Sequence, residues 1–106
     1  MIDDAEPMLP YVAISEIAVP DEGGPALEAA FRDRLGAVDA WPGFLGLEVL
    51  RHRRRPGCYL MITRWTTRDA FADYMRSADH KRSHDRIPEG EHAPRPAGFD
   101  DYDRVA

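Results

Sequence analysis

Two histidines, His80 and His84, lie four residues apart in the segment 76–90 (RSADHKRSHDRIPEG), just before a proline and a glycine. On a helix this spacing places both imidazoles on one face, where they could bind zinc or copper. The intervening KRS lacks the glutamate of the HExxH zinc motif, and the sequence offers no evident third ligand. We therefore do not expect a two-histidine metal site. Two interpretations of His84 stay open, a ligand to haem iron or a solvated side chain before a proline loop.

The elements that would position these histidines follow from the hydrophobic pattern. Residues 11–19 (YVAISEIAV) are rich in β-branched and aromatic types, which predicts a strand ended by Pro20. On that strand Ser15 shares a face with Ala13 and Ile17. Pro25 suits a first helical turn, and the following apolar residues recur at helical spacing, which predicts one continuous amphipathic helix despite Gly36. Its apolar positions are Leu27, Phe31, Leu35 and Val38.

Two further strands, 44–51 (FLGLEVLR) and 58–65 (CYLMITRW), are separated by a short RRRPG turn, which predicts an antiparallel hairpin with arginines at its exposed tip. On the first of them we expect Leu45, Leu47 and Val49 to face one way. Thr66 or Thr67 can cap the next helix, and a last strand is predicted over 98–106. That helix has an apolar stripe of Ala70, Phe71, Tyr74, Met75 and Ala78.

The resulting order, βαββαβ, predicts an α+β, ferredoxin-like fold in which two helices cover one face of a four-stranded antiparallel sheet. We expect a lead-in over residues 1–10 and a single domain over 11–106. The strands are apolar on both sides, so the other sheet face needs a cover. The cover we expect is the same face of a second copy, which predicts a homodimer built as a dimeric α+β barrel.

Composition excludes several classes of partner. The net charge of -5 argues against an electrostatic grip on nucleic acid, and no run approaches the ~20 apolar residues that a membrane span needs. The single cysteine, Cys58, cannot form an internal disulfide, and we find no signal-peptide pattern. We therefore expect a cytoplasmic protein that engages neither membrane nor nucleic acid.

Four segments resemble the antibiotic-biosynthesis-monooxygenase family of small dimeric α+β barrels, which includes haem-degrading and cofactor-independent quinol monooxygenases. They are ISEIAVP at 14–20, WPGFLGLEVLR at 41–51, YLMITRWTTRDAFADYM at 59–75 and SADHKRSH at 77–84. The resemblance covers most of the chain from Tyr11 onward. It implies a monooxygenase acting on an aromatic ring system.

The haem-degrading branch of this family is the more similar at the site. The resemblance implies that His84 is the proximal haem ligand and that Trp65 and Tyr74 occupy the aromatic positions of strand and helix. In this interpretation Tyr74 contacts the planar ligand, Ser15 donates to oxygen or substrate, and Arg86 pairs with a haem propionate, as Arg64 or Arg82 could. The chain departs from the branch at two positions. It has Tyr74 where the branch usually has a tryptophan on the helix, and Ser15 where the branch has an asparagine on the first strand. Both departures count against efficient haem oxidation.

Two alternatives stay open. The first is a cofactor-independent monooxygenase that uses molecular oxygen on a phenol or quinol. The resemblance to that branch is weaker, because its asparagine and tyrosine fall at Met61 and Phe71, which cannot stabilise a phenolate by hydrogen bonds. The second is a non-catalytic barrel that binds haem or a small apolar ligand.

Overall fold

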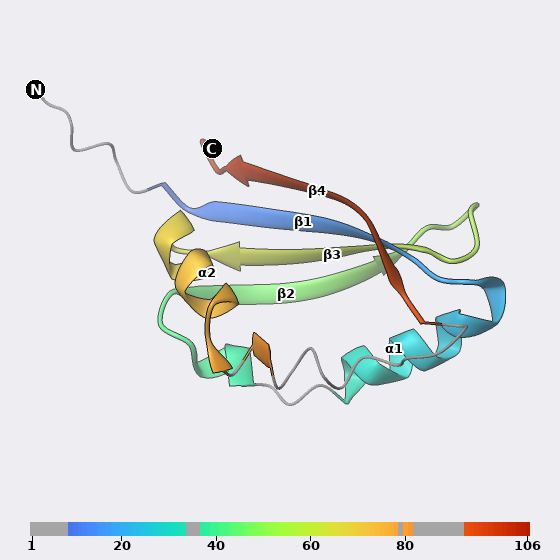
Figure 1. Ribbon diagram of the computed structural model, residues 1–106. Helices are drawn as coiled ribbons and strands as arrows, with labels where there is room; N and C mark the ends of the chain where they lie inside the picture. The colour runs from blue at the N-terminus through green and yellow to red at the C-terminus, as the bar shows by residue number, and fades with distance from the viewer. Residues whose placement is uncertain (1–8, 34–36, 79, 82–92) are drawn as a thin grey trace, which may run out of the picture.

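A computed structural model describes residues 9–33, 37–78, 80–81 and 93–106 (Figure 1). The four strands form one antiparallel sheet in the order β2-β3-β1-β4, and the chain order βαββαβ confirms the predicted ferredoxin-like fold. Short 3-10 turns lie at Asp21–Gly23 and Ala37–Ala40. The main elements are β1 (Tyr11–Ala18), α1 (Gly24–Arg32), β2 (Phe44–Arg51), β3 (Cys58–Trp65), α2 (Arg68–Met75) and β4 (Arg95–Asp103).

Both helices pack on the same face of the sheet, over opposite ends of it. Tyr74 of α2 lies in a core cluster with Trp65, and Leu27 of α1 lies in a second cluster with Tyr59. Tyr59 and Trp65 are an even number of residues apart on β3, so their side chains share a face. The two clusters therefore cover the two ends of one sheet surface, as the positions of α1 and α2 in Figure 1 also show.

The continuous helix predicted after Pro25 is wrong in its extent. The helix α1 ends at Arg32, and Asp33 leaves the helical region (φ -99°, ψ 17°) while its N–H donates to the carbonyl of Ala29 at 2.9 Å. Aspartate favours such helix ends because its side chain competes for local backbone groups. A separate 3-10 turn follows over Ala37–Ala40 and buries Val38 in the α2 end of the core, while Leu35 lies outside the described residues.

The β2–β3 hairpin is confirmed with the predicted bounds of both strands, but the prediction that Leu45 shares a face with Leu47 and Val49 is wrong. Phe44 pairs with Trp65 and Gly46 with Arg64, so an extra residue interrupts the register at this point. A bulge of this kind moves the following residues to the opposite face. Leu47 and Val49 consequently face the helices, whereas Leu45 is 58% exposed on the other side of the sheet.

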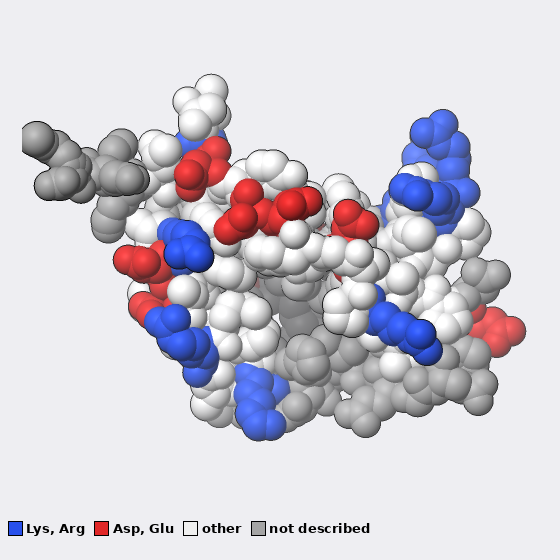
Figure 2. Space-filling model, turned by 45° about the horizontal axis from the view of Figure 1, so that its top comes forward, with Lys and Arg blue, Asp and Glu red and all other residues white. Residues whose placement is uncertain are grey.

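At the hairpin tip Arg53, Arg54 and Arg55 are exposed, as predicted. The ring of His52 shapes the turn, because its Nδ1 accepts the backbone N–H groups of Arg54 and Arg55 at 3.0 Å each. Figure 2 shows the basic side chains gathered there and acidic side chains spread along the upper edge of the molecule.

Thr67 is the N-cap of α2, since its hydroxyl accepts the N–H of Ala70 at 3.1 Å, and it is one of the two caps that the sequence predicted. The predicted apolar stripe of α2 is correct for the residues that meet the core and wrong at the far end. Tyr74 is buried, whereas Met75 is 44% exposed and Ala78 is exposed, because the helix ends at Met75.

The strand β4 runs over Arg95–Asp103, three residues earlier than predicted, and a register shift opposite Glu16 and Ile17 accommodates its start. It is an edge strand with every residue exposed. Tyr11 links β4 to β1, because the hydroxyl of this buried residue donates a hydrogen bond to Asp101 Oδ2 at 2.8 Å. Burial and then this hydrogen bond raise the pKa of Tyr11 to about 12. Neither described helix has the length and apolar character needed to cross a membrane.

Candidate functional site

Trp65 is the centre of the aromatic core at the α2 end of the sheet. Its side chain is 1% exposed, and its indole Nε1 donates to Thr63 Oγ1 at 2.9 Å. The ring contacts Phe44, Phe71 and Tyr74 at centroid distances of 5.2, 5.6 and 5.6 Å. Such contacts at a strand end fill the corner between sheet and helix.

Tyr74 is 6% exposed and stands between Trp65 and two outer rings. Trp41 contacts it edge-on at 5.4 Å, and His80 contacts it edge-on at 5.3 Å. The carbonyl of Tyr74 accepts a hydrogen bond from Ser77 Oγ at 2.6 Å, and the same hydroxyl accepts the N–H of His80 at 3.1 Å. The chain after α2 is thereby turned so that His80 lies against the Tyr74 ring.

Ser15 lies at the middle of β1, half-buried, opposite Met61 of β3 and Phe99 of β4. Its neighbours on the same face belong to different clusters: Ala13 is in the Trp65 cluster, and Ile17 packs against the Leu27 cluster. The Ser15 side chain therefore projects from the part of the helix-facing sheet surface that lies between the two clusters. Figure 2 shows the surface hollowed between the α2 end and the α1 end of the molecule.

His84 and Arg86 lie outside the described residues, so Ser15, Trp65 and Tyr74 are the predicted site residues that can be placed. Trp65 and Tyr74 are in direct contact, and Ser15 shares their sheet face. Arg64 projects from the opposite face and pairs with Glu48 at 2.8 Å, so it is excluded from this site. Within the described ranges no group of three or more histidine, cysteine, aspartate or glutamate side chains could hold a metal ion.

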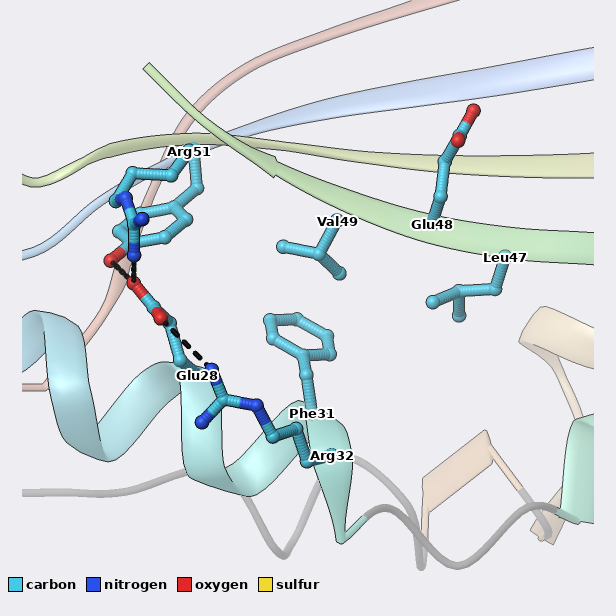
Figure 3. Close-up of a pocket in the computed structure, with 8 residues that line it drawn as sticks. Glu28, Phe31, Arg32, Leu47, Glu48, Val49 and Arg51 are labelled. Carbon is cyan, nitrogen blue, oxygen red and sulfur yellow. Dashed lines mark hydrogen bonds and ion pairs between the residues drawn. The ribbon is translucent and has the colours of Figure 1, made fainter. Parts of the chain in front are cut away.

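A gap of about 440 Å³ separates α1 from β2 (Figure 3). Phe31 points from α1 toward Val49 of β2, with Leu47 beside them, while Glu48 is directed away to the other face of the sheet. The three apolar side chains give the gap an apolar floor. Its size is within the range of small-molecule pockets in proteins.

One end of the gap carries a polar cluster centred on Glu28. The Tyr59 hydroxyl and Arg51 Nη1 both donate to Glu28 Oε2, at 2.5 and 2.7 Å, and Arg32 Nη2 donates to Oε1 at 3.3 Å. The hydrogen bond from Tyr59, followed by that from Arg51, lowers the pKa of Glu28. Burial, followed by the hydrogen bond to Glu28, raises the pKa of Tyr59.

Sequence reasoning missed this cluster. Arg51 and Tyr59 are 23 and 31 residues from Glu28, so no local spacing indicates that they meet. The i,i+4 pair of Glu28 and Arg32 was the one visible signal, and such pairs are common on solvated helix faces.

Replacing Glu28 with glutamine is expected to lower the free energy of unfolding by roughly 1–3 kcal/mol at pH 7, because the three hydrogen bonds to its charged carboxylate are weakened. The pKa of Glu28 is lowered in the folded state, so its contribution is complete above the ordinary value of 4.5 and is lost as the pH falls through the folded value. Urea unfolding of wild type and Glu28→Gln between pH 7 and 3 should show the difference shrinking below about pH 4.5. Tyr59→Phe should show the same trend, and a difference independent of pH would contradict the assignment.

The fold is similar to that of several proteins of known structure. The chain superposes on MhuD from Mycobacterium tuberculosis, a haem-degrader solved with two haems bound in its active site, with a TM-score of 0.74 and 28% identity over 91% of this chain and 96% of that one. A haem-free structure of the same mycobacterial protein gives 30% identity over 92% and 96% of the chains, with a TM-score of 0.68. SnoaB, a cofactor-independent oxygenase from Streptomyces nogalater, shares the fold at 16% identity (TM-score 0.72, 92% and 95% covered).

Among curated proteins, a haem oxygenase (mycobilin-producing) of Mycobacterium tuberculosis is 41% identical over 63 residues. That match covers 59% of this chain and 60% of the relative's length. Residues 10–86 match the family described as antibiotic biosynthesis monooxygenase, a stretch that includes both helices and the first three strands. The chain therefore belongs to the antibiotic biosynthesis monooxygenase family.

Proposed function

We propose that this chain is a monooxygenase that binds haem between its sheet and helices and degrades it oxidatively. The observation that carries the proposal is the 28% identity to a haem-degrader with haems bound in its active site, extending over more than nine-tenths of both chains. Likeness to the cofactor-independent oxygenase is restricted to the fold.

The described residues suit a flat, largely apolar ligand. The sheet face between the two cores offers the half-buried hydroxyl of Ser15, and the Tyr74 ring lies in the core cluster at the α2 end of that face, in contact with Trp65. Trp65 and Tyr74 are both buried, at 1% and 6% exposed. We assign Trp65 the role of supporting the Tyr74 ring and Tyr74 the contact with the ligand. His84 would hold the haem iron through its imidazole, and Arg86 would pair with a propionate. Bound haem supplies the iron and its oxygen chemistry, and the protein supplies ligation, shape and hydrogen bonds.

A ferric haem titration tests the proposal. We expect one equivalent of haem to give a saturable Soret shift with the wild type, and His84→Ala to weaken binding by tenfold or more because the imidazole that would hold the iron is lost. His52→Asn is the matched control, since asparagine keeps an acceptor for the turn of which His52 Nδ1 is part.

Turnover is then measured as loss of the Soret band with ascorbate in air, with catalase present to remove free peroxide. If haem binds through His84 but is not degraded, the chain is a haem-binding protein and not a haem-degrading enzyme. If the wild type shows no specific Soret shift, or if His84→Ala keeps it, the haem assignment is wrong and phenolic substrates become the next to screen.

We also propose that the functional unit is a homodimer closed by the sheet face opposite the helices. That face carries Val12, Ile14 and the displaced Leu45, none of which is covered by a described helix. Sedimentation should give the mass of two chains for the wild type, and Ile14→Asp should give one chain by burying an unpaired charge in the contact. Ser15→Asp, on the helix-facing side of the same strand, should remain dimeric; a monomeric wild type would contradict the proposal.

A further inference from the structure

We propose that the gap between α1 and β2 is a carboxylate site: it takes an apolar or aromatic skeleton against Phe31, Leu47 and Val49 and pairs its acid group with Arg32 and Arg51. The gap and the polar cluster at its end are adjacent, since all four residues of the cluster are among the eight that line the gap (Figure 3). Neither the family assignment nor the haem proposal uses these arginines.

The charge at this place favours an anion. Two guanidinium groups, Arg32 and Arg51, face a single carboxylate, Glu28, and the pKa of Tyr59 is raised so that its phenol is neutral. The second acid of the lining, Glu48, is neutralised on the other face by Arg64. One positive charge thus remains beside the gap, in a chain whose net charge is -5.

The arginines also have hydrogen-bonding capacity for a second carboxylate. The side chains of Arg32 and Arg51 are 72% and 65% exposed, whereas that of Glu28 is 20% exposed. A guanidinium has five N–H donors, and each of these two donates one described hydrogen bond to Glu28. Glu28 therefore holds both guanidinium groups at this end of the gap, and each guanidinium keeps N–H donors for a second carboxylate.

The apolar floor determines what else the ligand must carry. Phe31, Leu47 and Val49 converge across the gap, and 440 Å³ suits a phenyl ring or a short alkyl chain. Such an acid could come from two sources, a free small carboxylic acid or a propionate of haem bound next to α1. The shared chemistry is a carboxylate on an apolar skeleton.

The first arm of the test uses the haem-free full chain and titrates 4-phenylbutyrate by calorimetry, with 4-phenylbutanamide as the uncharged probe. We expect the acid to bind and the amide to bind at least about tenfold more weakly, because charge-assisted pairing is lost. Arg32→Gln should weaken binding of the acid by roughly the same factor. Arg76→Gln is the matched control, because Arg76 is also an exposed arginine at a helix end, at 70%, and pairs with an acid three residues earlier, Asp73. Equal binding of acid and amide, or equal effects of the two substitutions, would overturn the proposal.

The second arm distinguishes the sources. If 4-phenylbutyrate binds equally to haem-free and haem-loaded protein, the site takes a separate acid. If haem displaces the probe, and Arg32→Gln weakens binding of haem but not of its dimethyl ester, the carboxylate is a propionate. Because the first arm contains no haem, failure of the haem proposal leaves this one testable.

Discussion

Trp65→Ala is expected to lower the free energy of unfolding by about 3–5 kcal/mol, the range seen when a large buried aromatic side chain is truncated. The indole is 1% exposed and contacts rings from β2 and α2, so its removal leaves a cavity that these elements cannot fill without moving. Since small domains are stable by only about 5–15 kcal/mol, the variant should be substantially unfolded at moderate temperature.

The measurement is urea unfolding followed by circular dichroism at one fixed protein concentration, since a dimer's stability depends on concentration. Trp41→Ala is the matched control: Trp41 also contacts Tyr74 but is half-exposed, so its loss should cost less. Trp65→Phe should fall between them, because it keeps a ring and removes the hydrogen bond to Thr63. If Trp65→Ala is as stable as Trp41→Ala, Trp65 is not the centre of the core and a direct ligand contact becomes the better interpretation.

The accuracy of the sequence predictions depended on the range of the interactions involved. The strands 44–51 and 58–65 and the Thr67 cap were predicted correctly, because a short turn and a capping hydroxyl act within a few residues. The face of Leu45 was wrong because a bulge is set by pairing with β3, which strict alternation along one strand cannot reveal.

The candidate site shows the same division. Trp65 and Tyr74 were expected at the site through the family resemblance, and the strand, tight turn and helix that join them bring the two rings into contact. The Glu28 cluster joins three elements across 23 and 31 residues and was missed. The early end of α1 was also missed, because apolar spacing continued past the point where Asp33 leaves the helical conformation.

Ser15→Asn is expected to raise the rate of haem loss by about tenfold or more, if the proposed function holds. Ser15 is in the middle of β1, on the helix-facing surface of the sheet between the two core clusters. The proposed ligand binds against this surface, so the side chain at position 15 would contact it. A hydroxyl is short and offers one donor, whereas an asparagine amide reaches further and offers two N–H donors. A donor aimed at charge that develops on oxygen contributes factors of roughly 10²–10³ in enzymes, so even partial alignment should be measurable.

The rate is read from the Soret decay with ascorbate and catalase, after urea unfolding has shown that each variant is folded. Ser15→Ala removes the donor and should be slower than wild type, and Ser15→Thr keeps the hydroxyl and should stay near it. An increase in Ser15→Asn that Ser15→Ala reproduces would mean that loss of the serine hydroxyl, rather than the new amide donor, raises the rate. A Ser15→Asn rate equal to wild type would place the reacting oxygen away from β1, since a donor lengthened at this position would then have nothing to stabilise.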